Sequence, residues 1–176
     1  MKTKEFNKEV LYSVDTIVKV KDADIKRLKD QSGSNERKRI RLCAHRDVID
    51  PVHEMLIIHT RDTYVRPHKH LNKTESYHII EGTADIVIYD EMGVITDIIN
   101  MGVYGTGMIF FYRINDPLYH TLRITSDYFV FHETTNGPFD KADTIWAPWA
   151  PQDNDHGLVD KFMKDLTWKI SSTNKL

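Results

Sequence analysis

Two histidines and a glutamate are grouped at a spacing that suits metal binding. His68 and His70 are separated by one residue, Glu75 follows five positions after His70, and Gly82 follows seven positions after Glu75. Side chains alternate across a β-strand, so the two histidines would project from the same face. A carboxylate that follows a short turn can return to the same point, and such a donor set suits a divalent transition metal ion. The spacing therefore predicts a metal site.

The elements that would hold these residues are short β-type segments. After Pro51, runs rich in β-branched and aromatic residues alternate with turn sequences such as Glu-Gly-Thr and Asn-Asp-Pro. These runs cover residues 52–60, 62–65, 76–80, 84–89, 93–99, 108–112, 120–125 and 128–133. Short strands with a turn about every 8–12 residues predict an all-β protein, built as an antiparallel sandwich or barrel.

The N-terminal region predicts one strand and one helix. Residues 9–20 carry β-branched and aromatic side chains, which favour a strand. Asp22 predicts the start of a short helix because acidic residues are favoured in the first turn, and Gly33 can end it. Residues 36–47 are basic and irregular, and we expect no regular element there.

The C-terminal region has a different composition. Prolines flank a tryptophan at residues 148–151, and Leu158, Phe162 and Leu166 recur at helical spacing. We therefore expect a flap over the barrel that includes a short helix at residues 158–168. The predicted organisation is a single structural domain with three parts: an N-terminal strand and helix extension at 1–36, a barrel at 37–151 and a C-terminal tail with a short helix at 152–176.

The histidine and glutamate spacing resembles the first half of the cupin double motif, in which His-x-His, a glutamate and a glycine follow one another. His68, His70, Glu75 and Gly82 match that half. His120 follows an Asn-Asp-Pro turn and matches the metal-binding histidine of the second half. The resemblance implies a double-stranded β-helix, or jelly-roll barrel, with a metal held by these three histidines and the glutamate.

A narrower resemblance is carried by three further segments. Residues 63–70, the Lys73-x-Glu75 pair and the Ala-Pro-Trp-Ala-Pro sequence at 147–151 are similar to WbuC-type cupin-fold metalloproteins. This family is often associated with gene clusters for bacterial surface polysaccharides, which implies a sugar-derived substrate. The sequence departs from the cupin pattern at Asp62, where a leading glycine is usual, and at Ile124, where an asparagine is usual.

Strand alternation also predicts which side chains accompany the metal ligands. In a regular strand, Tyr64 and Arg66 would share the face of His68 and His70. An inward Arg66 would bind an anionic substrate, while the ordinary alternative is an arginine paired with a buried carboxylate. Tyr64 would be a candidate for proton transfer, and its alternative is a simple core aromatic.

The same reasoning applies to the strand that follows. Glu75 and Tyr77 would share one face and His78 would take the other, so we prefer Glu75 over His78 as a metal ligand. Tyr77 and His53 are the remaining candidates for proton transfer. Their alternatives are a core tyrosine and a hydrogen-bonded barrel histidine. Cys43 is expected to be a small buried residue.

Composition excludes several classes of partner and leaves a small-molecule role. The net charge is -2, which favours neither nucleic acid nor an anionic membrane, and no apolar run approaches the roughly 20 residues that span a bilayer. A single cysteine and a start without an apolar leader lead us to expect a cytoplasmic protein. The exposed sheet edges of a small jelly roll favour a homodimer.

The predicted activity is metal-dependent chemistry on a small anionic molecule. Iron, manganese, nickel and zinc all accept three imidazoles and one carboxylate. Four protein ligands on an octahedral ion leave two positions for substrate, which suits an isomerase, an epimerase or, with iron, a dioxygenase. The alternative is a non-catalytic module in which the metal binds a ligand or stabilises the barrel.

Overall fold

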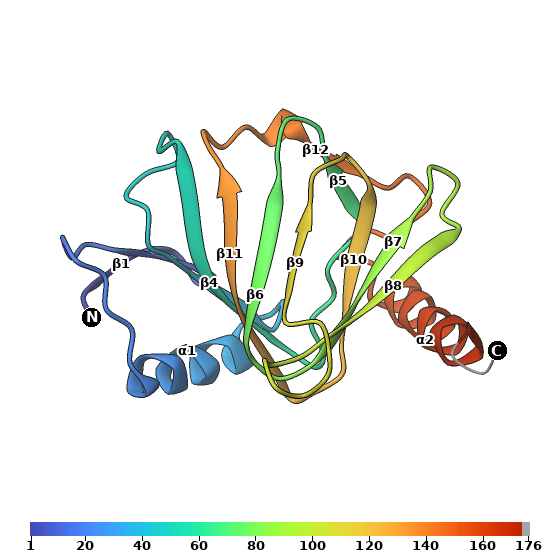
Figure 1. The fold of residues 1–176 in the computed structure, drawn as a ribbon, viewed down its shortest axis with the longest axis horizontal. Helices are drawn as coiled ribbons and strands as arrows, with labels where there is room; N and C mark the ends of the chain where they lie inside the picture. The colour runs from blue at the N-terminus through green and yellow to red at the C-terminus, as the bar shows by residue number, and fades with distance from the viewer. Residues whose placement is uncertain (174–176) are drawn as a thin grey trace.

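The computed structural model describes residues 1–173 and consists of two facing β-sheets with a helix on the outer side of each (Figure 1). The larger sheet has seven strands within the described residues. In spatial order they are β1 (Thr3–Asn7), β2 (Val10–Ser13), β3 (Arg39–Cys43), β4 (Val52–Thr60), β11 (Tyr128–Asn136), β6 (Glu75–Glu81) and β9 (Phe111–Ile114).

The smaller sheet has five strands in the same part of the chain. In spatial order they are β12 (Thr144–Trp146), β5 (His68–His70), β10 (Tyr119–Ile124), β7 (Ala84–Tyr89) and β8 (Ile95–Met101). A single 3-10 turn, Lys141–Asp143, precedes β12.

The order of the strands identifies the architecture. The central strands β4-β11-β6-β9 of one sheet face β5-β10-β7-β8 of the other, and every pair within these two sets is antiparallel. This is the double Greek-key arrangement of a jelly roll, in which the chain passes repeatedly from one sheet to the other. The all-β, cupin-type fold predicted from the sequence is confirmed.

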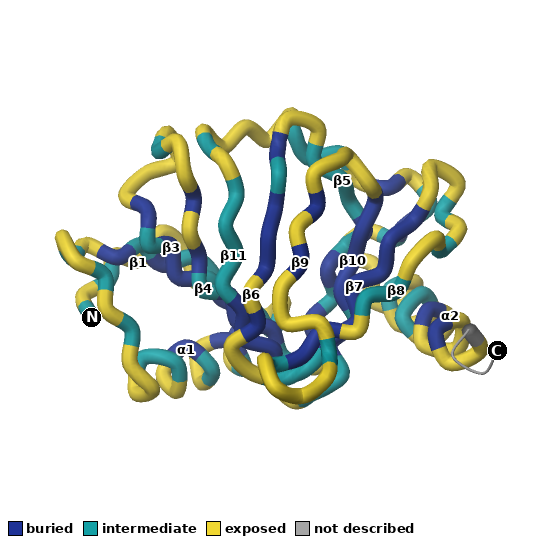
Figure 2. Tube along the Cα trace, viewed as in Figure 1, coloured by how far each residue is buried: buried dark blue, intermediate teal, exposed yellow. Residues whose placement is uncertain are grey.

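The space between the sheets is filled by apolar side chains that alternate along each strand. On β7, Ala84, Ile86 and Ile88 belong to this central core, whereas Val87 and Tyr89 pack on the outer side. All six residues of β7 are therefore buried, which Figure 2 shows as a continuous dark segment. A strand covered on both faces needs no polar alternation, and its sequence, Ala-Asp-Ile-Val-Ile-Tyr, is almost wholly apolar.

Helix α1 (Asp22–Ser34) covers the outer face of the larger sheet near β3 and β4. Its first turn is stabilised by Asp24, whose carboxylate accepts a hydrogen bond of 3.0 Å from the backbone N–H of Lys21. Leu28 is fully buried and packs in one cluster with Ile40 and Ile58 of the sheet. The start of this helix lies where the sequence predicted it.

Helix α2 (His156–Thr173) covers the outer face of the smaller sheet (Figure 1). Leu166 and Ile170 pack in one cluster with Val87, Tyr89 and Tyr119. The helix is longer at both ends than the predicted 158–168 segment because its apolar stripe continues to Ile170. None of the helices in the described part of the chain is long and apolar enough to span a membrane.

Gly82 explains the last position of the histidine-glutamate-glycine spacing. It lies between β6 and β7 with φ of 82°, a left-handed conformation that favours glycine. A Cβ atom placed there would lie 2.0 Å from the carbonyl oxygen of Tyr128 and 2.5 Å from Oγ of Ser126. This glycine therefore allows the tight turn that returns the chain from the larger sheet to the smaller one.

Three sequence predictions of secondary structure are wrong. Residues 62–65 are not a strand, and β5 is limited to His68–His70. Residues 36–47 were expected to be irregular but contain β3, which pairs with β2 and β4. The strand predicted at 9–20 is limited to Val10–Ser13, and it pairs with β1, which the sequence did not suggest.

Candidate metal centre

Three histidines meet on the inner face of the smaller sheet. His68 of β5 lies directly opposite His120 of β10 in the antiparallel register, and their ring centroids are 4.6 Å apart. His70 shares the side of His68 because it is two residues further along the strand. One nitrogen of each ring lies within 4.8 Å of the others. Among the described residues, this is the one group of three or more such donors that could hold a metal ion.

The hydrogen bonds of the imidazole rings fix the nitrogen that remains available. Nδ1 of His68 lies 2.8 Å from the carbonyl oxygen of Arg66, and Nδ1 of His120 lies 3.0 Å from that of Leu118. A carbonyl oxygen only accepts, so both Nδ1 atoms carry the proton and both Nε2 atoms keep a free lone pair. Nε2 of His120 is buried without any hydrogen-bond partner, as expected of a metal-binding nitrogen.

His70 is held in a similar way by a side chain. Its Nδ1 lies 3.2 Å from the hydroxyl oxygen of Thr144, which is its cross-strand neighbour on β12. Nε2 of His70 then faces the carboxylate described next. Each ring is thus oriented from its Nδ1 side, which is the usual outer support of a histidine metal ligand.

Glu75 reaches the histidines from the facing sheet. It is the first residue of β6 and is only 4% exposed. Its Oε2 lies 3.4 Å from Nε2 of His70, and its Oε1 lies 3.5 Å from Nε2 of His120. Two donors bound to one ion at about 2.1 Å are separated by about 3.0–3.4 Å, so this spacing is close to that of a shared metal. His78 is exposed on the other face of β6, as the alternation predicted.

The electrostatics of the cluster favour an ionised Glu75 and a neutral His68. Burial, together with the neighbouring His120 and His70, lowers the pKa of His68 to about 3. Burial acts against charge on Glu75 too, but the nearby His120 and His70 side chains outweigh it, and the pKa of Glu75 lies well below its usual range. The pKa of His120 is raised by the Glu75 carboxylate in spite of burial. A carboxylate held negative against imidazole nitrogens suits a cation.

Tyr112 is a neighbour of this cluster that the sequence reasoning missed. Its hydroxyl donates a hydrogen bond of 3.3 Å to Oε1 of Glu75. Tyr77, which the sequence placed on the same face as Glu75, is also buried in the interior, with its ring centroid 5.0 Å from that of Tyr112. Burial and the negative charge of Glu75 raise the pKa of both tyrosines well above the usual value. Both hydroxyls therefore remain protonated.

Glu133 is the second inward carboxylate of the site. It lies opposite Tyr77 in the register of β11 with β6, in phase with the core residues Phe129 and Phe131. Burial, followed by the charge of Glu75, raises the pKa of Glu133 to about 8. The alternation Phe-x-Phe-x-Glu at 129–133 was a usable sequence signal, because it places a carboxylate on the apolar face of a strand.

Tyr64 and Arg66 do not join the histidines as predicted. The hydroxyl of Tyr64 donates a hydrogen bond of 3.0 Å to the carbonyl of Pro151, and its ring contacts Phe162 of α2. Arg66 donates a hydrogen bond of 3.4 Å to the carbonyl of Ala147. The prediction assumed a regular strand from residue 64, but the backbone is not in a strand until His68, so the alternation does not extend that far.

Arg66 reaches the histidine cluster only through an intermediate side chain. Its guanidinium carbon lies 5.6 Å from the ring centroid of Trp146, and that ring lies 5.4 Å from the ring of His68. Trp146 is half exposed and pairs with His68 across β12 and β5. The tryptophan, not the arginine, therefore borders the histidines on the solvent side.

His53 lies in a separate cluster beside the barrel. It is buried, and its ring stacks on that of His45 with centroids 4.1 Å apart and planes 4° apart. Burial lowers the pKa of both rings. His45 in turn contacts Tyr12, which pairs with Cys43 across β2 and β3. His53 is therefore packed against His45 and not against the three clustered histidines, and Cys43 is buried as expected.

Comparisons with known proteins are consistent with this fold. A family model described as a domain of unknown function, DUF6016, matches residues 20–101. No curated protein matches the sequence. The solved structure of protein SO0799 from Shewanella oneidensis is similar with a TM-score of 0.52 and 10% identity, over 64% of this chain and 75% of that one. At this identity the likeness concerns the fold alone.

Two other solved structures share a smaller part of the chain. An oxalate decarboxylase from Bacillus subtilis, OxdC, matches with a TM-score of 0.45 and 18% identity, over 55% of this chain and 24% of that one. The capsular polysaccharide assembling protein CapF from Staphylococcus aureus matches with a TM-score of 0.45 and 21% identity, over 55% of this chain. The match spans 27% of the length of CapF.

Proposed function

We propose that this protein is a WbuC-type cupin that binds one divalent transition metal ion through His68, His70, Glu75 and His120. The observation that carries the proposal is the cluster of three histidines, each held from its Nδ1 side, in which Nε2 of His70 and of His120 lies beside the Glu75 carboxylate. Three nitrogens and one oxygen suit iron, manganese, nickel or zinc.

We further propose metal-dependent chemistry on a small anionic molecule. Three neutral imidazoles and one carboxylate leave a divalent ion with a residual positive charge, which favours an anionic oxygen ligand. A bound divalent ion would supply Lewis acidity to such a ligand. The sequence resemblance favours a sugar-derived substrate. We propose that the protein acts in the cytoplasm as an isomerase, an epimerase or a dioxygenase.

The residues around the metal ligands have separate tasks in this proposal. Tyr112 holds the Glu75 carboxylate through its hydroxyl. Glu133, with a pKa raised to about 8, can donate or accept a proton near neutral pH. Trp146 contacts His68 at the solvent side and can pack against the substrate. We no longer propose Tyr64 for proton transfer, because its hydroxyl is bound to Pro151.

Metal content and coordination test the proposal directly. We expect stoichiometric metal in native protein, with three nitrogen donors and one carboxylate by X-ray absorption spectroscopy. His68→Ala and His120→Ala should lose the metal, whereas His78→Ala should retain it, because His78 is exposed on the opposite face of β6. Full stoichiometry in both His68→Ala and His120→Ala would refute the ligand set.

A second function, a structural metal in a non-catalytic binding module, is favoured by the burial of the ligands. His120 and Glu75 are only 1% and 4% exposed. A closed structural ion would contribute folding free energy directly. If the metal is structural, its removal by a chelator should lower the melting temperature strongly. If the metal is catalytic, we expect exchangeable metal-bound water and only a small change in melting temperature.

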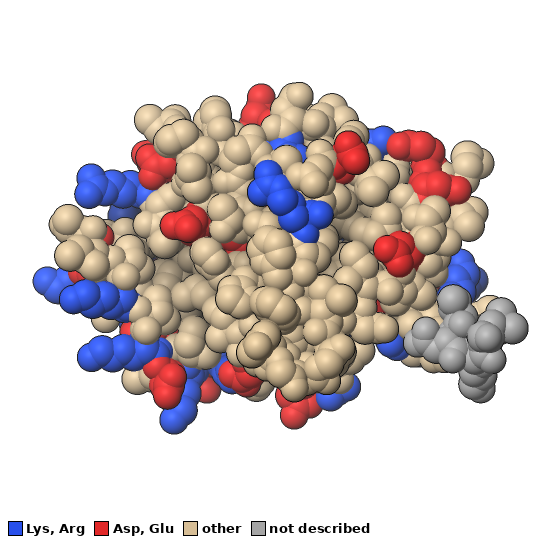
Figure 3. Space-filling view, in the orientation of Figure 1, with Lys and Arg blue, Asp and Glu red and all other residues tan. Residues whose placement is uncertain are grey.

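We also propose a homodimer, with β9 as the contact strand. This strand is at the free edge of the larger sheet, and Phe111 and Tyr104 beside it are exposed. Figure 3 shows one group of basic side chains in the region of β6 and β9, with mostly uncharged surface below it. As an edge strand, β9 leaves one row of backbone groups available to pair with another chain. Light scattering should give twice the mass of 20.6 kDa, and Phe111→Lys should reduce it to the monomer.

A further inference from the structure

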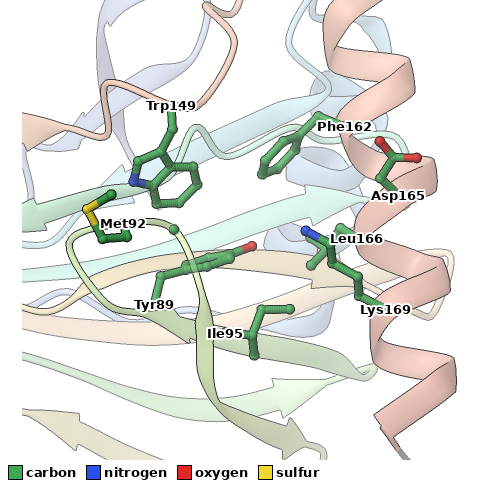
Figure 4. A pocket seen from close by; sticks show the side chains of 9 residues that line it. Tyr89, Met92, Ile95, Trp149, Phe162, Asp165, Leu166 and Lys169 are labelled. Carbon is green, nitrogen blue, oxygen red and sulfur yellow. The ribbon is translucent and has the colours of Figure 1, made fainter.

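A separate cavity lies on the outer side of the smaller sheet, beneath α2 (Figure 4). Its volume is about 250 Å³. On β7, Ile88 faces the central core and pairs with His120, whereas the next residue, Tyr89, faces the cavity and pairs with Tyr119. The cavity and the histidine cluster are therefore on opposite faces of one sheet.

Three aromatic side chains form one part of the cavity wall. The ring centroids of Tyr89 and Trp149 are 4.8 Å apart, and those of Trp149 and Phe162 are 6.4 Å apart with planes inclined by 25°. Ile95 adds an aliphatic side chain from β8. Gly93 allows the close approach of the indole, since a Cβ atom there would lie 2.8 Å from it. Such a wall favours a flat, apolar ring.

Polar groups are concentrated on the side of α2. The hydroxyl of Tyr89 is buried and has no hydrogen-bond partner. Figure 4 shows this hydroxyl directed toward α2, on the side where Asp165 and Lys169 project from the helix. A buried hydroxyl without a partner is unusual in a native structure, and it can form a hydrogen bond with a molecule bound in the cavity. The wall thus offers the Tyr89 hydroxyl for hydrogen bonding, and the carboxylate of Asp165 makes the helix side negative.

We propose that this cavity binds a phenol-class molecule, a single aromatic ring with one hydroxyl group. A ring hydroxyl both donates and accepts, so it can pair with the Tyr89 hydroxyl, which has no partner in the free protein. A cavity of about 150 Å³ holds benzene, so the volume here suits one ring with small substituents. A carboxylate would be repelled by Asp165, and a polyol would leave hydroxyls unpaired against the aromatic wall.

The test is a titration of the full chain with p-cresol, followed by NMR of the Trp149 indole N–H and the Ile95 methyl groups. We expect saturable shifts of both signals. Toluene, which lacks the hydroxyl, should bind about two- to tenfold more weakly, the range for one hydrogen bond. Benzoate and methyl β-glucoside are the anionic and polyol comparisons, and both should bind more weakly than p-cresol.

A conservative variant separates binding from folding. Tyr89→Phe should weaken p-cresol binding about two- to tenfold and leave the melting temperature unchanged, because the hydroxyl has no partner in the free protein. Tyr104→Phe, which removes an exposed hydroxyl, should change neither property. The proposal is overturned by an absence of saturable shifts, by equal affinity in Tyr89→Phe, or by tighter binding of benzoate or the glucoside.

Discussion

Tyr112 provides a sharp test of the metal centre because it contacts the ligand set without belonging to it. Its hydroxyl donates to Oε1 of Glu75 over 3.3 Å inside the barrel. Tyr112→Phe keeps the ring and removes only the donor. Loss of such an outer support typically weakens metal binding by about 10- to 100-fold. The contact is longer than an ideal O–H···O bond, so we expect the lower limit, about tenfold or 1.4 kcal/mol.

The assay is competition for metal with a chromophoric chelator at fixed pH. Tyr104→Phe is the matched control, because Tyr104 is exposed and its ring contacts Phe110, which is not one of the proposed metal ligands. Thermal unfolding of the metal-free proteins shows whether Tyr112→Phe alters the fold itself. Unchanged affinity in Tyr112→Phe, or an equal loss in Tyr104→Phe, would refute the reasoning that Tyr112 orients Glu75.

Three further predictions concern stability and reactivity. Gly82→Ala should lower the free energy of unfolding in urea by more than about 2 kcal/mol, because φ is 82° and the Tyr128 carbonyl oxygen would lie 2.0 Å from the new Cβ. Gly33→Ala is the control: this position in α1 has open space around it, so the substitution should be neutral or stabilising. Burial holds the pKa of His59 well below its usual value, so only the unfolded chain takes up this proton as the pH falls below about 6.5. Between pH 7.5 and 5.5, the free energy of unfolding of the wild type should therefore fall by about 1.4 kcal/mol more than that of His59→Gln. Equal falls in the two proteins would contradict this prediction. Burial raises the pKa of the Cys43 thiol to about 11, so iodoacetamide should label it only after denaturation, and rapid labelling of native protein would show that the site opens.

The parts of the fold that could be predicted from sequence are those in which local pattern and tertiary context agree. The bounds of β4 and β7 match the predicted runs because apolar residues continue between clear turns. In β3, the alternation Arg-Ile-Arg-Leu was present, but the charged residues concealed it. Its apolar residues, Ile40 and Leu42, pack in one cluster with Leu28 of α1, and that contact was not visible in the local sequence.

The candidate site shows the same division between local and non-local information. His68, His70 and Glu75 could be found because they are close in sequence. Tyr112 could not, since it reaches Glu75 from another strand, 37 positions away. The error at Tyr64 arose because alternation holds only within a continuous strand, and Pro67, which lacks a backbone N–H, precedes β5.

The two inward carboxylates give the site its chemical asymmetry. Glu75 and Glu133 lie on neighbouring strands of one sheet, yet the pKa of the first is held well below its usual range and that of the second is raised to about 8. Imidazole nitrogens stabilise the charge on Glu75, and that charge, together with burial, disfavours a second one on Glu133. A protein can use one acid to bind a cation and another to carry a proton by placing the two in environments that separate their pKa values. Because the charge on Glu75 favours the proton on Glu133, a cation bound by Glu75 would lower the pKa of Glu133, and we expect metal binding to release a proton there.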